Sequence, residues 1–210
     1  MAIKVIIVED DPMARQMFEV FIGGCEKYEV AASIGNADMV DVYCENSDIG
    51  LILMDIRTMA QANGLDAAER VKRKYPQIRV IIVTSMPEQA YLDRARKIGV
   101  DSFWYKTVIR EDFISLMDRT VAGEKIFPDR PPELKIGNTT NYEFTEREME
   151  VLRELTTGAS NAAIAEKLFL SERTVKTHIQ HMQEKTGFSN RVELAVKARE
   201  LGIAIGEDEH

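Results

Sequence analysis

Residues 3–11, IKVIIVEDD, decide the fold of this chain. The run Ile3–Val8 is almost wholly apolar and rich in β-branched side chains, and three carboxylates follow it at once. A short apolar run bounded by polar groups indicates a strand buried on both faces, as in a parallel sheet. The carboxyl ends of parallel strands meet at one edge of a sheet, so these acidic residues should face whatever follows the neighbouring strands.

The same strand pattern recurs five times between residues 1 and 122, and amphipathic segments lie between the strands. We expect strands at Lys4–Val8, Glu29–Ser33, Gly50–Met54, Arg79–Thr84 and Ser102–Lys106. We expect helices near Pro12–Ile22, Ala37–Glu45, Leu65–Tyr75, Gln89–Ile98 and Glu111–Ala122. This alternation predicts an α/β domain with a five-stranded, doubly wound parallel sheet.

Polar side chains stand at the ends of four of these strands. They are Glu9, Asp10, Asp55, Thr84 and Lys106. Carboxylates brought close together repel one another unless a cation joins them. The crevice at this edge of the sheet is therefore expected to bind a hard divalent metal through its oxygen ligands.

Residues 123–143 differ from the stretches on either side. They hold three of the six prolines and no helical stripe, which predicts a linker. Residues 144–210 then carry four helix signals and no strand. Thr145 with Glu148 forms the pattern of a capping box at the start of the first of these helices. The later helices have plausible caps at Ser160, Ser171 and Asn190.

The segment Ser171–Thr186 has two contrasting faces. Val175, Ile179 and Met182 recur at helical spacing and should face the core. The opposite side carries Arg173, Lys176, Thr177 and Gln180. Long polar donors suit base edges, and cations and hydroxyls suit phosphates, so this helix could lie on DNA.

Charge sets a limit on that interpretation. The chain has a net charge of −8, which argues against a broadly basic nucleic-acid binder. Residues 144–210 hold nine Lys and Arg against twelve Asp and Glu. A single such domain should bind DNA weakly, and a dimer on two half-sites would offset the weakness. In the last helix Leu194, Ala198 and Leu201 mark an apolar stripe, while Val192, Ala195 and Val196 lie beyond its edge. The second group is a candidate dimer surface, and extra core burial is an equal alternative.

Composition also bears on the compartment. No apolar stretch approaches the ~18 residues of a membrane span, and the N-terminus lacks a basic segment leading into an apolar one. Cys25 and Cys44 have no metal-ligand spacing and are expected to be reduced packing residues. We therefore expect a cytoplasmic protein without a membrane partner.

Residues 1–122 resemble the receiver domain of two-component response regulators. The resemblance rests on the pair Glu9-Asp10, on Asp55, on Thr84 with the small Ser85 after it, and on Lys106. It implies a flavodoxin-like sheet in which Asp55 is the phosphoacceptor and Lys106 and Thr84 contact the phosphoryl group. It also implies that Mg²⁺ is bound by Glu9, Asp10, Asp55 and the backbone carbonyl of Arg57, and that Thr84 and Phe103 form the switch. The loop after Asp55 departs from the family, because it lacks a proline and reaches Gly64 in nine steps where eight is usual.

Residues 144–205 are similar to the LuxR-type helix-turn-helix domain, through TERE, GASNAAIAEKL, SERTVKTH and KTG. The resemblance implies that Lys176, Thr177 and Gln180 enter the major groove. It places Thr174, Arg173, Lys185, Arg191 and Asn161 on the DNA backbone.

The two resemblances together predict a transcriptional response regulator of the NarL/FixJ type rather than an enzyme. The implied partners are a sensor histidine kinase, double-stranded promoter DNA and a second copy of the chain on phosphorylation, with RNA polymerase as a candidate. One alternative is a receiver-fold regulator that works without phosphorylation. The other is an Asp-nucleophile phosphatase, although Arg57 stands where such enzymes usually carry an acid–base Asp.

Overall fold

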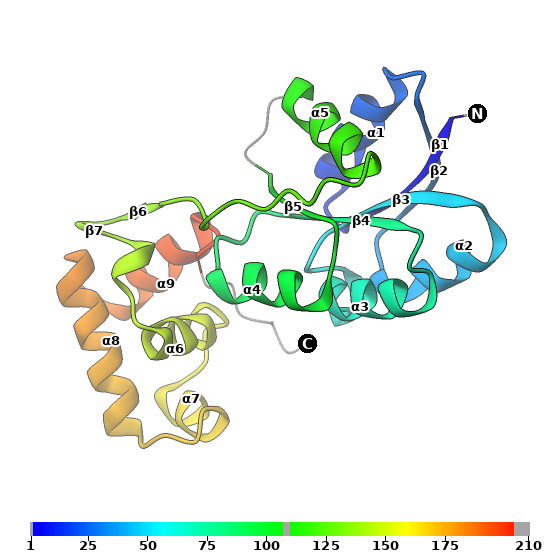
Figure 1. The fold of residues 1–210 in the computed structure, drawn as a ribbon. Coiled ribbons are helices and arrows are strands. Elements are labelled where there is room, and N and C mark those ends of the chain that lie inside the picture. Colours follow the sequence, from blue (N-terminus) through cyan, green and yellow to red (C-terminus); the bar gives the residue numbers. More distant parts are fainter. Residues whose placement is uncertain (1, 107–109, 204–210) are drawn as a thin grey trace. The chain divides into compact units, whose positions relative to one another are not determined.

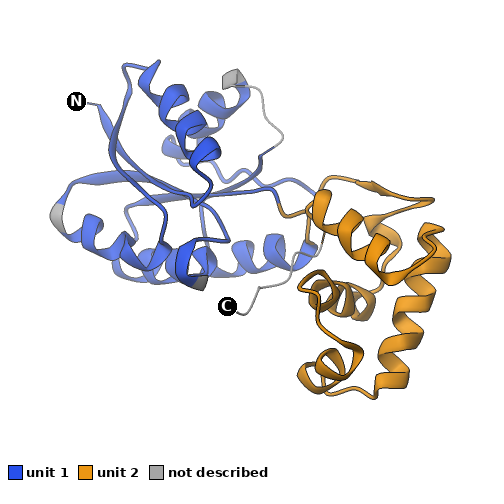
Figure 2. Cartoon of the chain, turned by 180° about the vertical axis from the view of Figure 1, so that it is seen from behind, with its two compact units in different colours: residues 1–85, 89–131 blue, residues 86–88, 132–210 orange. Residues whose placement is uncertain are grey.

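The computed structural model describes residues 2–106 and 110–203 (Figure 1). The chain forms two compact units (Figure 2). The first unit comprises residues 1–85 and 89–131, and the second comprises residues 86–88 and 132–210. The principal division, between residues 131 and 132, falls inside the stretch predicted to be a linker.

The first unit contains the predicted five-stranded parallel sheet. Its strands are β1 (Ile3–Val8), β2 (Tyr28–Ile34), β3 (Ile49–Met54), β4 (Arg79–Thr84) and β5 (Ser102–Tyr105). All pairings are parallel, and the strand order is β2-β1-β3-β4-β5. This order is that of a flavodoxin-like doubly wound fold, so the predicted fold class is confirmed.

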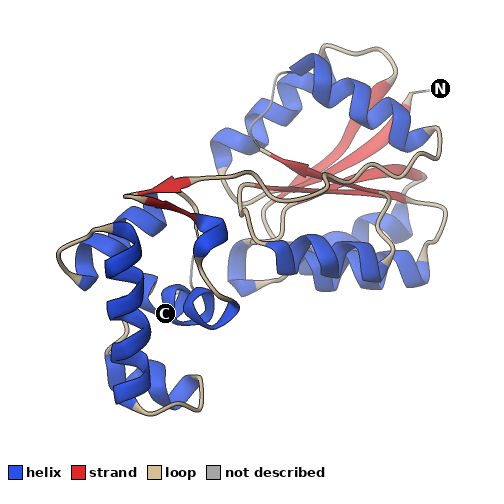
Figure 3. Cartoon of the chain, turned by 60° about the vertical axis from the view of Figure 1, so that its left-hand side comes forward, coloured by secondary structure: helices blue, strands red, loops and turns tan. Residues whose placement is uncertain are grey.

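Helices cover both faces of this sheet. They are α1 (Pro12–Gly23), α2 (Val40–Asn46, after the 3₁₀ turn η1, Ala37–Met39), α3 (Gly64–Lys74), α4 (Gln89–Ile98) and α5 (Arg110–Val121). Helices α1 and α5 lie on one face, and α2, α3 and α4 lie on the other (Figures 1 and 3). The tilted rings of Phe18 and Phe113 pack at 5.1 Å between centroids where α1 meets α5 over the sheet. Asp11 caps α1, because its Oδ1 accepts hydrogen bonds from the amides of residues 13 and 14.

After α5 the chain returns along the free edge of the sheet. The amide of Phe103 in β5 donates to the carbonyl of Ile126 at 2.8 Å, and Ser102 forms a parallel bridge with Ile126. Pairing of this kind satisfies backbone groups that an exposed edge strand would leave open.

From residue 144 to residue 203 the second unit has helices and no strand, as predicted, but part of the stretch predicted to be a linker forms a hairpin. Its helices are α6 (Glu146–Thr156), α7 (Asn161–Lys167), α8 (Glu172–Thr186) and α9 (Arg191–Glu200). A short hairpin of β6 (Lys135–Ile136) and β7 (Thr139–Thr140) precedes them, followed by the 3₁₀ turn η3 (Asn141–Glu143). The sequence did not predict this hairpin, whose Ile136 is fully buried in the core of the unit.

The helix starts in this unit match the sequence signals. Thr145 and Glu148 form a reciprocal capping box, and Ser160, Ser171 and Asn190 cap α7, α8 and α9. The expected core side chains of α8 are buried. Of the apolar stripe expected on the last helix, Leu194 and Ala198 are buried, whereas Leu201, which caps the end of α9, is 37% exposed. Among the described residues, no helix is long and apolar enough to cross a membrane.

Candidate functional site

The crevice of the first unit lies where the strand order reverses. Strands β1 and β3 are paired neighbours, with Val8 opposite Met54, although β2 separates them in the sequence. Glu9 and Asp55 each follow one of these paired residues. In open α/β sheets this reversal point, at the carboxyl ends of the strands, is where ligands bind.

Three carboxylates meet at this point. One oxygen each from Glu9, Asp10 and Asp55 can be chosen so that all three lie within 4.8 Å of one another. Glu9 and Asp55 are 1% and 7% exposed, and Asp10 is half-buried. The side chains predicted to hold a metal are therefore together and largely withdrawn from water.

Lys106 reaches the same cluster from the end of β5. Its Nζ lies 2.6 Å from Oε2 of Glu9 and 2.8 Å from Oδ2 of Asp55. Its own amide donates to the carbonyl of Thr84 at 2.8 Å, which fixes the chain after β5 against the end of β4. Burial alone would lower the pKa of Lys106, but the charges of Asp55 and Glu9 outweigh it and raise that pKa, so the ammonium remains charged.

The surroundings of Glu9 and Asp55 disfavour the ionised forms of these carboxylates. Burial, followed by the charge of Asp55, raises the pKa of Glu9 to about 7 despite the nearby Lys106. Burial also raises the pKa of Asp55, against the attraction of Lys106. With all three carboxylates ionised, the cluster and its single ammonium would carry a net charge of about −2. A divalent cation with oxygen ligands would neutralise that charge, so this set of donors fits Mg²⁺.

Backbone contacts fix the position of Asp55. Its Oδ1 accepts a hydrogen bond of 2.7 Å from the amide of Ile56. Gly64, at the start of α3, lies directly against the Asp55 backbone, since a Cβ at position 64 would be 1.8 Å from the Asp55 carbonyl oxygen. The sequence shows this glycine only as the end of an unusual loop and does not reveal its steric role.

The two predicted switch residues are both buried. Thr84, the last residue of β4, and Phe103, in β5, are 0% and 1% exposed. The Phe103 ring packs edge-on against the ring of Tyr105 at 5.1 Å between centroids. Arg57, the predicted source of a backbone ligand, lies two residues past Asp55 and pairs with Asn63 across the loop.

The second unit presents the predicted DNA-facing side of α8. Arg173, Lys176, Thr177 and Gln180 are all exposed, opposite the buried core positions of the helix. The Thr177 hydroxyl donates to the Arg173 carbonyl at 3.0 Å, and the Gln180 amide donates to Glu184 at 2.9 Å. The structure therefore gathers the proposed base-reading side chains on one open helical face.

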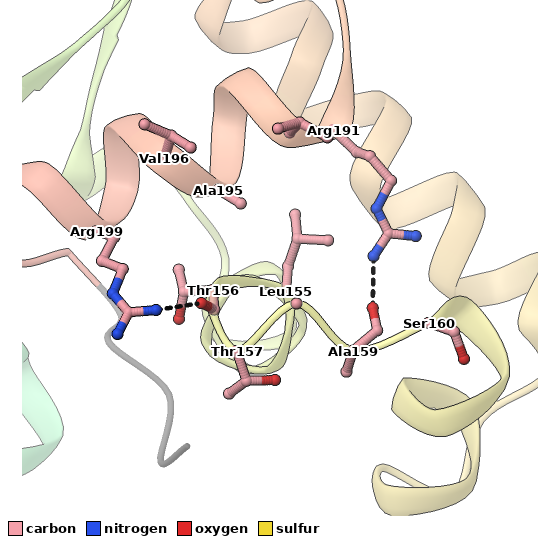
Figure 4. Close-up of a pocket in the computed structure, with 11 residues that line it drawn as sticks. Leu155, Thr156, Thr157, Ala159, Ser160, Arg191, Ala195, Val196 and Arg199 are labelled. Atoms are coloured by element: carbon pink, nitrogen blue, oxygen red, sulfur yellow. Dashed lines mark hydrogen bonds between the residues drawn. The ribbon is translucent and has the colours of Figure 1, made fainter. Parts of the chain in front are cut away.

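Several of the residues predicted to contact DNA phosphates make hydrogen bonds or ion pairs within the second unit. Thr174 lies in the first turn of α8, where its amide and hydroxyl contact the hydroxyl of Ser171. Lys185 donates to Oε2 of Glu148 at 2.6 Å, in the capping box of α6. Arg191 donates to Oδ1 of Asn161 at 2.7 Å and to the Ala159 carbonyl at 2.6 Å (Figure 4). Lys185 and Arg191 therefore also tie helices together, a role that sequence reasoning missed.

The predicted dimer surface lies on α9. Val192 and Val196 are 64% and 47% exposed, whereas Ala195 is half-buried and packs against the core. These residues line a groove of about 350 Å³ between α9 and the turn that joins α6 to α7 (Figure 4). Arg191 and Arg199 stand near opposite ends of the groove, as drawn in Figure 4, and Leu155 lies below Ala195.

The first unit is a doubly wound sheet with a lysine in an acidic crevice, and the second is a helical unit with an open α8 face. This combination defines the class of two-domain receiver and helix-turn-helix proteins. The family model described as the response regulator receiver domain matches residues 5–118, and that of bacterial regulatory proteins of the LuxR family matches residues 143–198. The chain belongs to the response regulators of two-component systems, with a LuxR-type DNA-binding domain, and this family regulates transcription rather than catalysing metabolic reactions.

Individual relatives extend over nearly the whole chain. The response regulator VraR of Staphylococcus epidermidis is 32% identical over 94% of this chain and 97% of its own. The uncharacterized transcriptional regulatory protein YxjL of Bacillus subtilis is 29% identical over 96% and 97% of the two chains. A structure of two RcsB dimers bound to two parallel DNAs is 19% identical over 95% and 98% of the two chains, with a TM-score of 0.56.

Proposed function

We propose that Asp55 accepts a phosphoryl group from a sensor histidine kinase, and that this event controls dimerisation on promoter DNA. The observation that carries the first half is the geometry around Asp55. A buried carboxylate lies 2.8 Å from the Lys106 ammonium and beside two further carboxylates. This is the arrangement that an aspartyl nucleophile and its counter-charges require.

Each residue of the crevice has a defined task in this proposal. Asp10, Asp55 and the Arg57 carbonyl would hold Mg²⁺ directly, with Glu9 beside them, and the bound ion would neutralise phosphoryl charge and orient the oxygens. Asp55 attacks phosphorus through one carboxylate oxygen while the bond to the kinase histidine breaks. Lys106 supplies a positive charge to the phosphoryl oxygens, and the Thr84 hydroxyl donates to one of them.

Labelling by acetyl phosphate tests this half. The wild-type chain should be labelled only when Mg²⁺ is present, and Asp10→Asn should lose labelling while remaining folded. Labelling of Asp10→Asn at the wild-type rate would contradict the assignment of the metal site.

Thr84 and Phe103 would couple the phosphoryl group to the rest of the receiver. The switch works only to the extent that the phosphorylated and unphosphorylated states differ in their contacts with that group. The hydroxyl of Thr84 moves toward the phosphoryl oxygens in this proposal, and the Phe103 ring occupies the space behind it. Both side chains are buried on paired neighbouring strands, with Phe103 opposite Ile82, two residues before Thr84, and this placement supports the coupling.

The α8 face is the proposed DNA interface. Lys176, Thr177 and Gln180 would enter the major groove, with Arg173 and Thr174 on the phosphates. Lys185, Arg191 and Asn161 would add phosphate contacts. Lys185 is already ordered by its ion pair with Glu148, and Arg191 and Asn161 are ordered by the hydrogen bond between them. Side chains held in place lose little conformational entropy on binding, which favours such a role.

Dimerisation completes the proposal: phosphorylation of Asp55 favours a dimer through the receiver, and α9 adds contacts between the C-terminal domains on DNA. Two exposed valines on one helix, Val192 and Val196, are costly to leave in water, and Ala195 between them allows close approach. The similar RcsB structure contains dimers bound to DNA, which supports a dimer of this chain on DNA. Sedimentation with and without beryllofluoride should show a dimer only in the first case.

Val196→Glu tests the helix surface, because it would bury a charge in the contact. The variant should lose cooperative binding to a two-site DNA probe. Val20→Glu, at a valine of equal chemistry that is 64% exposed on α1, serves as the control and should bind cooperatively. Cooperative binding by Val196→Glu would remove α9 from the dimer contact.

A further inference from the structure

The loop between β3 and α3 is the part of the crevice that departs most from its family. It has an extra residue and no proline, yet the structure shows it closed upon itself. The Gly64 amide donates to the Ile56 carbonyl at 2.8 Å, and Arg57 pairs with Asn63 in an antiparallel bridge. The loop is therefore a small hairpin-like structure whose base lies beside Asp55.

Thr58 holds the inside of this loop. Its side chain is 6% exposed, and its hydroxyl donates to the Ala62 carbonyl at 2.7 Å. The same hydroxyl accepts a hydrogen bond of 3.1 Å from the Ala37 amide, in the segment that follows β2. The Thr58 side chain thus joins the two sides of the loop to each other and joins the loop to the segment that follows β2.

The extra residue is accommodated farther from the crevice. Ala60 has φ of 59° and ψ of 30°, in the left-handed region, and Met59 donates to the Gly35 carbonyl at 2.8 Å. The left-handed residue therefore lies beyond Thr58, whose own backbone is extended, with φ of −141° and ψ of 169°.

We propose that Thr58 is a positioning residue that holds the Arg57 carbonyl in place for Mg²⁺. This inference rests on the proposed function of the crevice. The Arg57 carbonyl belongs to the peptide unit that joins Arg57 to Thr58, so a Thr58 side chain fixed on two sides limits rotation of that peptide. Mg²⁺ requires ligands at about 2.0–2.1 Å in near-octahedral geometry, so freedom in a backbone ligand lowers affinity directly.

The same hydroxyl also explains how the loop is held without the usual proline. A proline fixes φ of its own residue and so restricts the chain. Here the restriction comes from two hydrogen bonds to backbone groups of Ala37 and Ala62, which are themselves buried. Removing the hydroxyl would leave a buried amide and a buried carbonyl without this partner.

Magnesium titration of the full chain by calorimetry tests the proposal. Thr58→Val keeps the volume of the side chain and removes both hydrogen bonds, and it should weaken Mg²⁺ binding about tenfold or more. Thr58→Ser restores the hydroxyl and should bind Mg²⁺ within about twofold of wild type. Saturating Mg²⁺ should recover most of the acetyl phosphate labelling rate of Thr58→Val, since Asp55 and Lys106 are unchanged.

A second buried threonine provides a matched control. Thr120 in α5 is 0% exposed, and its hydroxyl donates to the Leu116 carbonyl at 2.7 Å and pairs with Ser102, at the end of β5 away from the crevice. Thr120→Val should lower the melting temperature but leave Mg²⁺ affinity unchanged. Wild-type Mg²⁺ affinity in folded Thr58→Val, with a lowered melting temperature, would overturn the proposal and leave Thr58 a merely structural residue.

Two further measurements keep the outcome clear. Should Thr58→Val not fold, Thr58→Ala removes the same hydroxyl without placing a methyl group against the Ala62 carbonyl, and the same comparison applies. Asp10→Asn separates this proposal from the function on which it rests. Unchanged Mg²⁺ affinity in Asp10→Asn would overturn the metal site itself, whereas a loss in Asp10→Asn without a loss in Thr58→Val would overturn only the role of Thr58.

Discussion

Gly64→Ala should disable the crevice by a steric route that removes none of its charged groups. The new Cβ would lie 1.8 Å from the Asp55 carbonyl oxygen and 2.9 Å from its carbonyl carbon. Real Cβ atoms essentially never approach closer than 3.0 Å, so the two segments must separate by roughly 1.2 Å. The neighbour is backbone, which cannot rotate aside as a flexible side chain could.

The expected effects follow from that displacement. Forcing an extra group into a packed site costs about 1–3 kcal/mol of unfolding free energy. A misplacement of about 1 Å at a reacting group can slow a reaction about 100-fold, so acetyl phosphate labelling of Asp55 should fall by about that factor. Urea unfolding and the labelling rate, measured on the same preparation, give both quantities.

Gly23→Ala is the matched control. Gly23 is the last residue of α1, and a Cβ there meets nothing within 4 Å. Its unfolding free energy should change by less than about 1 kcal/mol, and its labelling rate should equal that of wild type. Labelling of folded Gly64→Ala within about twofold of wild type would refute the claim that this close approach positions Asp55.

Three further substitutions probe other parts of the chain. Asp101 is buried, which raises its pKa, but hydrogen bonds from Lys72, a backbone amide and Arg79 outweigh burial and hold the pKa below its usual value. Asp101→Asn should therefore lower the unfolding free energy by about 3–5 kcal/mol at pH 7. The difference in unfolding free energy between wild type and variant should shrink only as the pH falls below about 4 and through the lowered pKa of Asp101. A difference that grows on acidification would contradict this role of Asp101. Lys176→Ala should cost about 1–3 kcal/mol against a specific site, and an equal loss on random DNA in a mobility-shift titration would reassign Lys176 to the phosphates. Phe169→Gly should raise the unfolding free energy by about 0.5–1 kcal/mol, because Phe169 is in the left-handed region with φ of 54° and its side chain is 96% exposed. A lower melting temperature of the variant would show that the Phe169 ring has a stabilising contact.

The crevice was predictable because strand ends can be located from the sequence. Apolar β-branched runs fix where β1, β3, β4 and β5 stop, and the order of a doubly wound sheet brings those ends together. In the structure Glu9, Asp10 and Asp55 do lie within 4.8 Å of one another, and Lys106 contacts Glu9 and Asp55.

Features that depend on tertiary contacts were not predictable in this way. Lys185 is paired with Glu148, a residue 37 positions away, and nothing in the local pattern of α8 indicates that contact. Likewise, Arg191 reaches Asn161 and the Ala159 carbonyl, 30 and 32 positions earlier. The β6–β7 hairpin has two residues in each strand, which is too short for a period-two pattern to appear.

The extra loop residue illustrates a third kind of limit. Counting residues between Asp55 and Gly64 detects the insertion but does not say where the chain absorbs it. The structure places the left-handed residue at Ala60, on the far side of the buried Thr58. Alanine carries no sequence signal for that conformation, since glycine and asparagine are the residues that usually adopt it.

The most direct test of the account is to locate the phosphoryl group after labelling with acetyl phosphate and Mg²⁺. Borohydride reduces an aspartyl phosphate to homoserine, and peptide mass spectrometry then identifies the position. If Asp55 is the phosphoacceptor, homoserine should appear at position 55 alone, and none should appear in Asp55→Asn. Homoserine at Asp10 or Asp11, or at any aspartate outside the crevice, with position 55 unmodified, would contradict it.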